Sequence, residues 1–395
     1  IAKINESHRH SIQDILQESV KDRQVSDVPI GAFLSGGIDS SAIVSHMTGT
    51  SDNPITTLTI GFKEKEFDES EHSAEISGLF KTNHQLLTLD EEQLLESLPA
   101  AINAMDQPTM DGINTFLISR AANEAGLKVV LSGLGGDELF GGYPSFRLVP
   151  KLLERKKWLK VYPKFLLNLG TRILKSSLPV DQGIKLEHWL NGKLSGAHEY
   201  FLIRALYCQD QVFELFNDQS LAEKETLKNF ESTKESLSLD KLNGDFNLIS
   251  YLETTHYLQN MLLRDTDMMS MAHPLEVRVP FMDHKLVEYM FNMPAPLKKL
   301  TGTPKALLVD SLKPALPDSI VHRKKMGFTL PFEPWMRGAM KSEMESVLLT
   351  SVKPLEDLIS QTTVESIWKQ FLAGKLSWSR PWALYVLKRW VDKNL

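Results

Sequence analysis

The feature that most constrains the fold is a regular alternation of strand-like and helix-like segments up to residue 133. Short apolar runs bounded by turn residues predict strands over 28–34, 55–62, 84–89 and 128–133. Apolar residues at helical spacing predict helices over 1–27, from about residue 40, and over 68–80, 90–105 and 114–126, with Asp90 as the N-cap of the fourth. Because strands that alternate with helices form a parallel sheet covered on both faces, we expect an α/β fold with a parallel sheet flanked by helices.

The alternation stops near Pro150. Long amphipathic stretches such as 161–178 follow, and no segment between 150 and 300 has a convincing strand pattern. The sequence therefore predicts a large helical C-terminal part. We expect three parts: an α/β core over 1–150, a helical and more variable segment over 151–260, and a helical C-terminal part over 261–395 that packs on the core.

The first predicted strand ends in a glycine- and serine-rich turn, Ser35-Gly36-Gly37, which leads into a helix that begins near Ser40. Bare backbone N–H groups at such a turn, together with a helix N-terminus, favour an anion such as phosphate. Asp39 lies in this turn, where its carboxylate would repel a phosphate unless a cation lay between them. Mg²⁺ is a hard cation that bridges carboxylates and phosphate oxygens. Asp39 therefore predicts a Mg²⁺ ion beside the phosphate site.

A second turn of similar design follows the fourth predicted strand, at residues 131–143. It leaves the strand through Ser-Gly and Gly-Gly and then presents Asp137 and Glu138 at the start of a predicted helix. Because the carboxyl ends of parallel strands share one edge of the sheet, we expect Asp39 and Asp137 to converge on the same metal. For either turn alone, a helix-capping acid is the alternative. The chain has neither a Walker A loop nor a G-x-G-x-x-G turn, which disfavours a P-loop NTPase and a dinucleotide dehydrogenase.

Composition argues against several other classes of protein. A formal net charge of −6 disfavours a nucleic-acid binder, which needs a basic face. No apolar run reaches the roughly 18 residues of a membrane span, and the first residues contain no signal-peptide apolar region. The single cysteine, Cys208, rules out a disulfide within the chain. We therefore expect a cytoplasmic protein with neither nucleic acid nor membrane as a partner.

Three motifs carry a resemblance to a known family. The segment "SGGIDSS" (35–41) resembles the PP-loop of the N-type ATP pyrophosphatases, which split ATP between the α- and β-phosphates. The segments "LSGLGGDELFGGY" (131–143) and "SMAHPLEVRVPFMDHKLVEY" (270–289) are narrower, and together they resemble the synthetase domain of the glutamine-dependent asparagine synthetases and their β-lactam synthetase relatives. The resemblance runs from about residue 8 to about residue 390. It implies an adenine nucleotide α-hydrolase-like fold and an ATP-dependent, AMP-forming amide ligase with ATP and Mg²⁺ as cofactors.

The resemblance also implies a set of binding residues. The expected substrates are a carboxylate, with aspartate favoured, and ammonia. The metal would be held by Asp39 and Asp137. The residues expected to bind ATP are Leu34, Ser35, Gly36, Gly37, Asp39, Ser40, Ser41, Ile60, Gly133, Gly135 and Gly136, of which Leu34, Ile60 and Gly133 would line the adenine pocket. The residues expected to bind the acceptor substrate are Asp111, Asn114, Glu138 and Tyr143.

Three residues are expected to be catalytic by the same resemblance. Lys305 falls where the family carries its catalytic lysine, and Asp267 occupies a further family position. Arg323 begins the basic cluster 323–325, which resembles a family segment that we expect to face the phosphates or to close over them. The alternatives are a surface helix lysine for Lys305 and a solvated run of charge for the cluster.

Two departures from the family pattern bear on function. Many asparagine-forming relatives have an acid where this chain has Leu134, which puts aspartate as the acceptor in question. Full-length relatives also begin with a glutaminase domain that this chain lacks, and the start at Ile1 favours a piece cut from a longer protein. That domain is therefore an expected partner, and a homodimer is possible. The alternatives are amidation of another acid such as a sugar acid, an intramolecular amide as in β-lactam synthetases, and a non-catalytic ATP-binding module.

Overall fold

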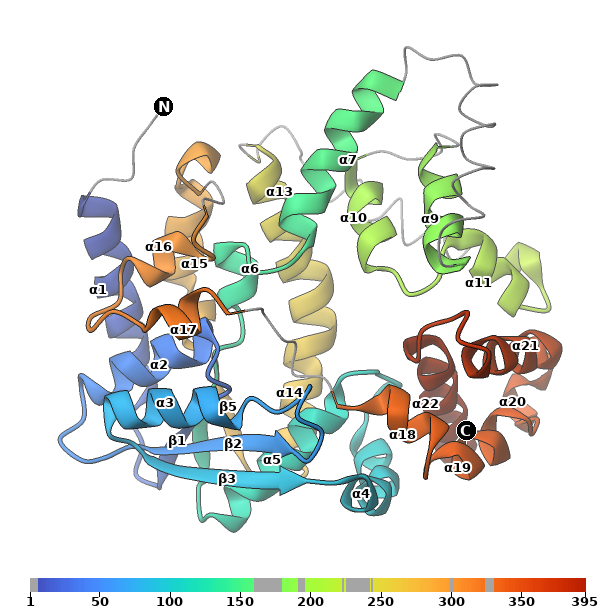
Figure 1. Cartoon of the computed structure of the whole chain (residues 1–395), viewed down its shortest axis with the longest axis horizontal. Coiled ribbons are helices and arrows are strands. Elements are labelled where there is room, and N and C mark those ends of the chain that lie inside the picture. The colour runs from blue at the N-terminus through green and yellow to red at the C-terminus, as the bar shows by residue number, and fades with distance from the viewer. Residues whose placement is uncertain are drawn as a thin grey trace. The chain divides into compact units, whose positions relative to one another are not determined.

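A computed structural model describes residues 6–159, 180–190, 196–221, 224, 242, 244–298, 302–323 and 330–395. The chain divides into two compact units, which are described separately (Figure 1). Unit 1 comprises Ile1–Asp106, Asp111–Tyr143 and Asn243–Pro331, and unit 2 comprises Gln107–Met110, Pro144–Leu242 and Phe332–Leu395. The three predicted parts, with boundaries near 150 and 260, remain a prediction.

Unit 1 is built around a five-stranded sheet in which every pair of neighbours is parallel. The strand order is β3-β2-β1-β4-β5, so β1 lies at the centre, and its residue Gly31 pairs with Thr56 on β2 and Val130 on β4. The strands are β1 (Ile30–Phe33), β2 (Thr56–Phe62), β3 (Asn83–Leu89), β4 (Val129–Leu131) and β5 (Glu276–Arg278). The predicted α/β fold class and the first four strands are confirmed.

The fifth strand corrects the prediction that 150–300 contains no strand. It is only three residues long, too short for a period-two pattern to show, and it pairs with β4. Glu276 and Arg278, two positions apart on this strand, form an ion pair with 2.8 Å between Arg278 Nε and Glu276 Oε1. Arg278 also donates to the carbonyl oxygens of Arg23 and Val25, so the pair fastens this edge of the sheet to the end of α1 (Glu6–Arg23).

Two apolar clusters cover the sheet, as alternating side chains of a strand require. Leu131 belongs to the cluster formed with α1 and α2, whereas its neighbour Val130 belongs to the cluster formed with α5. Figure 1 shows α2 and α3 on one side of the sheet and α5 on the other. The helices up to Phe140 are α1, α2 (Ile38–Thr48), α3 (Ser70–Phe80), α4 (Glu91–Ala104), α5 (Gly112–Glu124) and α6 (Gly136–Phe140).

The remaining helices of unit 1 come from residues 245–321. They are α13 (Asp245–Leu252), the π-helix η2 (Glu253–Leu262), α14 (Leu263–Met271), the 3₁₀ turns η3 (Pro280–Met282) and η4 (Ala295–Lys298), α15 (His284–Asn292), α16 (Ala306–Val309) and α17 (Asp318–Val321). In this half of the chain, α14 packs on α5 and β5, while α16 packs on α1, α2 and α6.

The predicted N-cap of α4 is confirmed. The Asp90 side chain accepts a hydrogen bond from Gln93 N at 3.0 Å, and Gln93 Oε1 accepts one from Asp90 N at 3.1 Å. This reciprocal capping box satisfies two backbone donors that a helix start otherwise leaves open.

Unit 2 is helical throughout its described residues. Its elements are α7 (Ser145–Leu159), α9 (Val180–Leu190), α10 (Gly196–Arg204), α11 (Gln209–Leu215), α18 (Phe332–Arg337), α19 (Lys341–Leu348), α20 (Lys353–Glu356), α21 (Gln361–Leu372) and α22 (Ser379–Asn394). Cys208 is buried beside Trp189 and Leu202, and Trp382 packs against Phe332 with 4.3 Å between ring centroids. Among the described residues of the whole chain, no helix is both long and apolar enough to cross a membrane.

Candidate functional site

The first loop, residues 34–37, connects β1 to α2 and is held in shape by its own serines. Ser35 N donates to Ser40 Oγ at 3.2 Å, and Ser40 Oγ lies 3.2 Å from the Gly37 carbonyl oxygen, to which it donates. Gly36 has φ +64°, and a Cβ there would lie 2.7 Å from His72 Cβ. Only glycine therefore fits this turn, whose backbone rests against the first turn of α3.

The second loop, residues 132–135, connects β4 to α6 and packs directly on the first. A Cβ at Gly133 would lie 2.8 Å from Ser40 N, and a Cβ at Gly136 would collide with the Asp39 carboxylate. The absence of side chains at these glycines allows the two loops to touch. Because β1 and β4 are neighbours in the sheet, their carboxyl ends bring Asp39 and Asp137 together.

Lys305 joins these two acids. Its Nζ forms ion pairs with Asp39 Oδ2 and Asp137 Oδ1, and the residue is 6% exposed. Burial alone would lower the pKa of Lys305, but the nearby carboxylates Asp137 and Asp39 outweigh it and raise the pKa above its ordinary value. The backbone of Lys305 has φ +49°, an uncommon conformation for a residue with a side chain. The interpretation of Lys305 as a surface lysine is therefore wrong.

Arg323 lies beside the first loop. Its Nη1 forms an ion pair with Glu69 Oε1 at 2.5 Å, and its Nη2 lies 3.6 Å from the position of a Cβ at Gly37. Both side chains of this pair are largely buried, so Arg323 is not part of a solvated run of charge. The other two members of the basic cluster, Lys324 and Lys325, lie outside the described residues.

A chain of polar contacts leads from the second loop to the segment before α5. Tyr143 Oη donates to Glu138 Oε1 at 2.9 Å, and Tyr257 Oη donates to Asp111 Oδ2 at 3.1 Å. The two tyrosine rings meet edge to face with 5.7 Å between their centroids. Ser250 Oγ donates to the Glu138 carbonyl oxygen at 2.8 Å. Three predicted substrate residues, Asp111, Glu138 and Tyr143, therefore belong to one connected group.

The acid and the phenol at one end of this group are both strongly shifted. Burial, with Asp137 as the next cause, raises the pKa of Glu138 to about 7, although the hydrogen bond from Tyr143 opposes the rise. Burial and the charge of Glu138 raise the pKa of Tyr143 well above its ordinary value. Titratable groups shifted by burial beside specific charge partners are typical of functional sites.

Other predicted residues lie apart from these contacts or at the sheet. Asp267 is exposed on α14, whereas its neighbour Asp265 on the same helix is buried. Leu34 and Ile60 are buried, and Asn114 is half-buried on α5. Ser41 Oγ is buried at the start of α2 with no hydrogen-bond partner among the described residues.

Sequence reasoning missed two residues of the site, Glu69 and Tyr257. Glu69 is one of several acids around the start of α3, and nothing in the sequence marks it as the partner of Arg323. Tyr257 lies in the π-helix η2, where side chains follow a wider turn than α-helical spacing assumes.

The donor set around Lys305 fits Mg²⁺. No cluster of three or more His, Cys, Asp or Glu side chains that could hold a metal occurs among the described residues. Mg²⁺ in nucleotide sites needs only one or two carboxylates, because phosphate oxygens and water supply the other ligands. Asp39 and Asp137 both contact the single cationic atom Lys305 Nζ, so both carboxylates are within reach of one cation.

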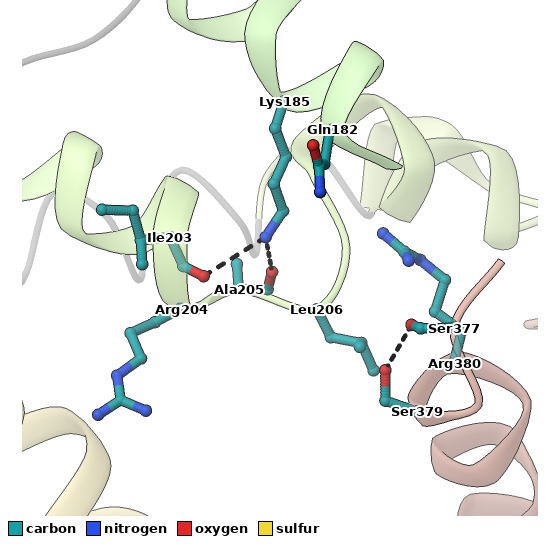
Figure 2. Close-up of a pocket in the computed structure, with 9 residues that line it drawn as sticks. All are labelled: Gln182, Lys185, Ile203, Arg204, Ala205, Leu206, Ser377, Ser379 and Arg380. Carbon is teal, nitrogen blue, oxygen red and sulfur yellow. Dashed lines mark hydrogen bonds between the residues drawn. The ribbon is translucent and has the colours of Figure 1, made fainter. Parts of the chain in front are cut away.

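Unit 2 contains a separate pocket of about 270 Å³ (Figure 2). Lys185 points at the last turn of α10, where its Nζ donates to the carbonyl oxygen of Ala205 at 2.8 Å. The guanidinium of Arg380 lies 5.5 Å from the centre of the Tyr207 ring. These basic side chains thus have structural contacts. All the lining residues belong to unit 2, whereas every predicted site residue belongs to unit 1.

The chain is similar to known enzymes along nearly its whole length. It is 26% identical over 391 residues to the glutamine-hydrolysing asparagine synthetase 1 of Bacillus subtilis (strain 168), covering 97% of this chain and 59% of that protein. It is 24% identical over 402 residues to the amidase chyE of Penicillium rubens, covering 94% of this chain and 59% of that protein. The chain therefore spans less than two thirds of the length of these relatives.

A solved structure and a family model complete the comparisons. The NH3-dependent NAD synthetase of Campylobacter jejuni aligns with 51% of this chain and 98% of its own, at 15% identity and a TM-score of 0.25, which is too low to support any statement. The model of the asparagine synthase family matches residues 11–392, which confirms the resemblance inferred from the motifs. The chain belongs to the asparagine synthase family.

Proposed function

We propose that this chain is the synthetase part of an ATP-dependent, AMP-forming amide ligase. The observation that carries the proposal is the meeting of Asp39, Asp137 and Lys305 where two glycine-rich loops leave neighbouring parallel strands. Crevices at the carboxyl ends of such strands are the usual ligand sites of α/β sheets. Membership in the asparagine synthase family supports the same assignment.

In this proposal the first loop binds the β- and γ-phosphates of ATP through its backbone N–H groups and the hydroxyls of Ser35, Ser40 and Ser41. Asp39 and Asp137 would hold Mg²⁺, which when bound supplies positive charge to the leaving pyrophosphate. A substrate carboxylate oxygen attacks the α-phosphorus, and pyrophosphate departs. Lys305, released from its carboxylates, would stabilise the charge that develops on the phosphates. The protein's main contribution is thus positioning and charge.

The acceptor acid would bind at the group formed by Asp111, Tyr257, Tyr143 and Glu138. Ammonia then attacks the acyl carbon of the adenylate, and AMP leaves with the formation of the amide. Aspartate is the favoured acceptor because the Bacillus subtilis relative is named an asparagine synthetase. The ammonia would come from glutamine through a glutaminase domain, in keeping with relatives that are much longer than this chain.

A different acceptor is the second candidate. Leu134, half-buried in the second loop, has no group that could bind or deprotonate an amine. The fungal relative is named an amidase, so the family includes proteins with other names than asparagine synthetase. Amidation of another acid, such as a sugar acid, and formation of an intramolecular amide both fit the same adenylating site.

The experiment is an acceptor panel on the full chain, with MgATP and ammonium. AMP and pyrophosphate formation would be measured with aspartate, glutamate and several sugar acids, and each reaction would be repeated with Asp39→Asn. Formation that requires aspartate and disappears in Asp39→Asn supports asparagine synthesis. Formation with a different acid supports the second candidate. ATP binding without turnover of any acid would favour a non-catalytic module and contradict the proposal.

A further inference from the structure

We propose that Glu69 is a positioning residue, which holds the Arg323 guanidinium against the first loop so that Arg323 contacts the phosphates of ATP. The inference rests on the proposed function and adds a residue that the motifs do not assign. Glu69 directly precedes α3, and Arg323 follows α17 by two residues, so the pair joins distant parts of unit 1.

The guanidinium lies between the carboxylate and the loop. Arg323 Nη1 bonds to Glu69 Oε1 at 2.5 Å, while Nη2 lies 3.6 Å from the position of a Cβ at Gly37. Arginine has five N–H donors in a planar fork, so one nitrogen can serve a carboxylate while the other serves a phosphate. The geometry therefore directs one edge of Arg323 toward the predicted phosphate site.

Glu69 is not used to cap the helix that follows it. Asp68 performs that task, because Ser70 N donates to Asp68 Oδ1 at 3.2 Å and Ser70 Oγ donates to Asp68 Oδ2 at 2.6 Å. The Glu69 side chain makes no capping hydrogen bond to α3 and is 7% exposed. A buried carboxylate needs a partner, and Arg323 supplies the positive charge.

The first turn of α3 supports both the loop and the arginine. The backbone of His72 and Ser73 touches Gly36, and Glu69 at the same end of the helix holds Arg323. Because one helix fixes both parts, the distance between the guanidinium and the loop is set by a rigid element rather than by a flexible side chain.

The test compares the affinities of pyrophosphate, ATP and AMP for the full chain, measured by calorimetry with Mg²⁺ present. The variants are Glu69→Gln, Arg323→Gln and the double variant. Loss of a supporting hydrogen bond commonly costs about tenfold to a hundredfold in affinity or activity. We expect each single variant to lose about that much affinity for pyrophosphate and ATP. AMP affinity stays within about twofold, and the double variant is no weaker than Arg323→Gln, since both act through one contact.

The control variant is Glu75→Gln, which removes an exposed carboxylate on the same helix. Glu75 Oε1 accepts from Ser319 Oγ at 2.7 Å, so it also joins α3 to α17, but away from the loop. We expect its nucleotide affinities to equal those of the wild type. Retained AMP binding shows that a variant is folded. If Glu69→Gln does not fold, Arg323→Lys is the second variant; it keeps the charge without the fork and should still lose pyrophosphate affinity.

Several results would overturn the inference. Wild-type affinity in Glu69→Gln, or a gain of affinity, would mean that Glu69 does not orient Arg323 and merely opposes the phosphate charge. Additive losses in the double variant would mean that the two residues act separately. If the wild type binds neither ATP nor pyrophosphate, the proposed function fails as well, which distinguishes that failure from the loss of this inference alone.

Discussion

Gly142 and Gly78 differ in what a single added methyl group would meet. A Cβ at Gly142 would collide with Asp137 Oδ1 and lie 2.5 Å from Lys305 Cε, whereas a Cβ at Gly78 in α3 has no other atom within 4 Å. We expect Gly142→Ala to lower the free energy of unfolding by about 1–3 kcal/mol and to weaken ATP binding, because it separates the ion pair. Gly78→Ala, the matched control, should raise it by up to about 1 kcal/mol. Urea denaturation measures both, and equal shifts would contradict the packing argument.

Lys298 makes stability depend on pH in the alkaline range. It is buried, and its Nζ donates to Asn247 Oδ1 and to the Met290 carbonyl oxygen. Burial lowers the pKa of Lys298 from 10.5 to about 8. Between these two values the unfolded chain holds more protons at this side chain than the folded chain, so the free energy of unfolding rises as pH increases through this window.

The variant Lys298→Met tests this dependence, because it removes the titrating group. As pH increases from about 7.5 to 10, we expect the wild type to gain roughly 2 kcal/mol of unfolding free energy relative to the variant. Chemical denaturation of both proteins at several pH values gives the difference. Parallel curves would show that Lys298 does not titrate in this range.

Helix α19 ends on a lysine from another helix. Lys388 of α22 is buried, and its Nζ donates to the carbonyl oxygens of Leu348 at 3.1 Å and Thr350 at 2.7 Å and to Gln361 Oε1 at 2.8 Å. The last carbonyls of a helix have no partner within it, so this ammonium satisfies them and also meets the negative end of the dipole. The contact therefore ties α19, α21 and α22 together.

Replacement of this lysine should destabilise unit 2. Lys388→Met leaves several buried acceptors without a donor, and we expect a loss of about 2–4 kcal/mol in the free energy of unfolding. Lys393→Met, which changes an exposed lysine on the same helix, should lie within about 0.5 kcal/mol of the wild type. Thermal and urea denaturation measure both variants. Similar stability in the two would mean that the cap contributes little.

Elements with a strong local pattern could be predicted from the sequence, and elements held by their neighbours could not. The strands β1 to β4 and the capped helix α4 follow from apolar runs and Asp90. The three-residue strand β5 exists because β4 offers it a partner, and the π-helix η2 departs from the spacing that sequence patterns assume. Local sequence does not contain that information.

For the site, the same distinction applies across the whole of unit 1. The meeting of Asp39 with Asp137 could be predicted, because parallel strands place both loops at one edge of the sheet. The contact between Glu69 and Arg323 and the contact between Tyr257 and Asp111 join residues that are 254 and 146 positions apart. Only the packing of residues 245–323 against the sheet brings them together, and no motif encodes that packing.

The central claim is that the site cleaves ATP between its α- and β-phosphates. Product analysis tests it most directly: the full chain is incubated with MgATP, ammonium and the acceptor panel, and AMP, ADP, pyrophosphate and phosphate are quantified together. The account predicts equal amounts of AMP and pyrophosphate in the presence of an accepted acid, and none from Lys305→Met. ADP and phosphate as the products, or equal AMP formation by Lys305→Met, would contradict it.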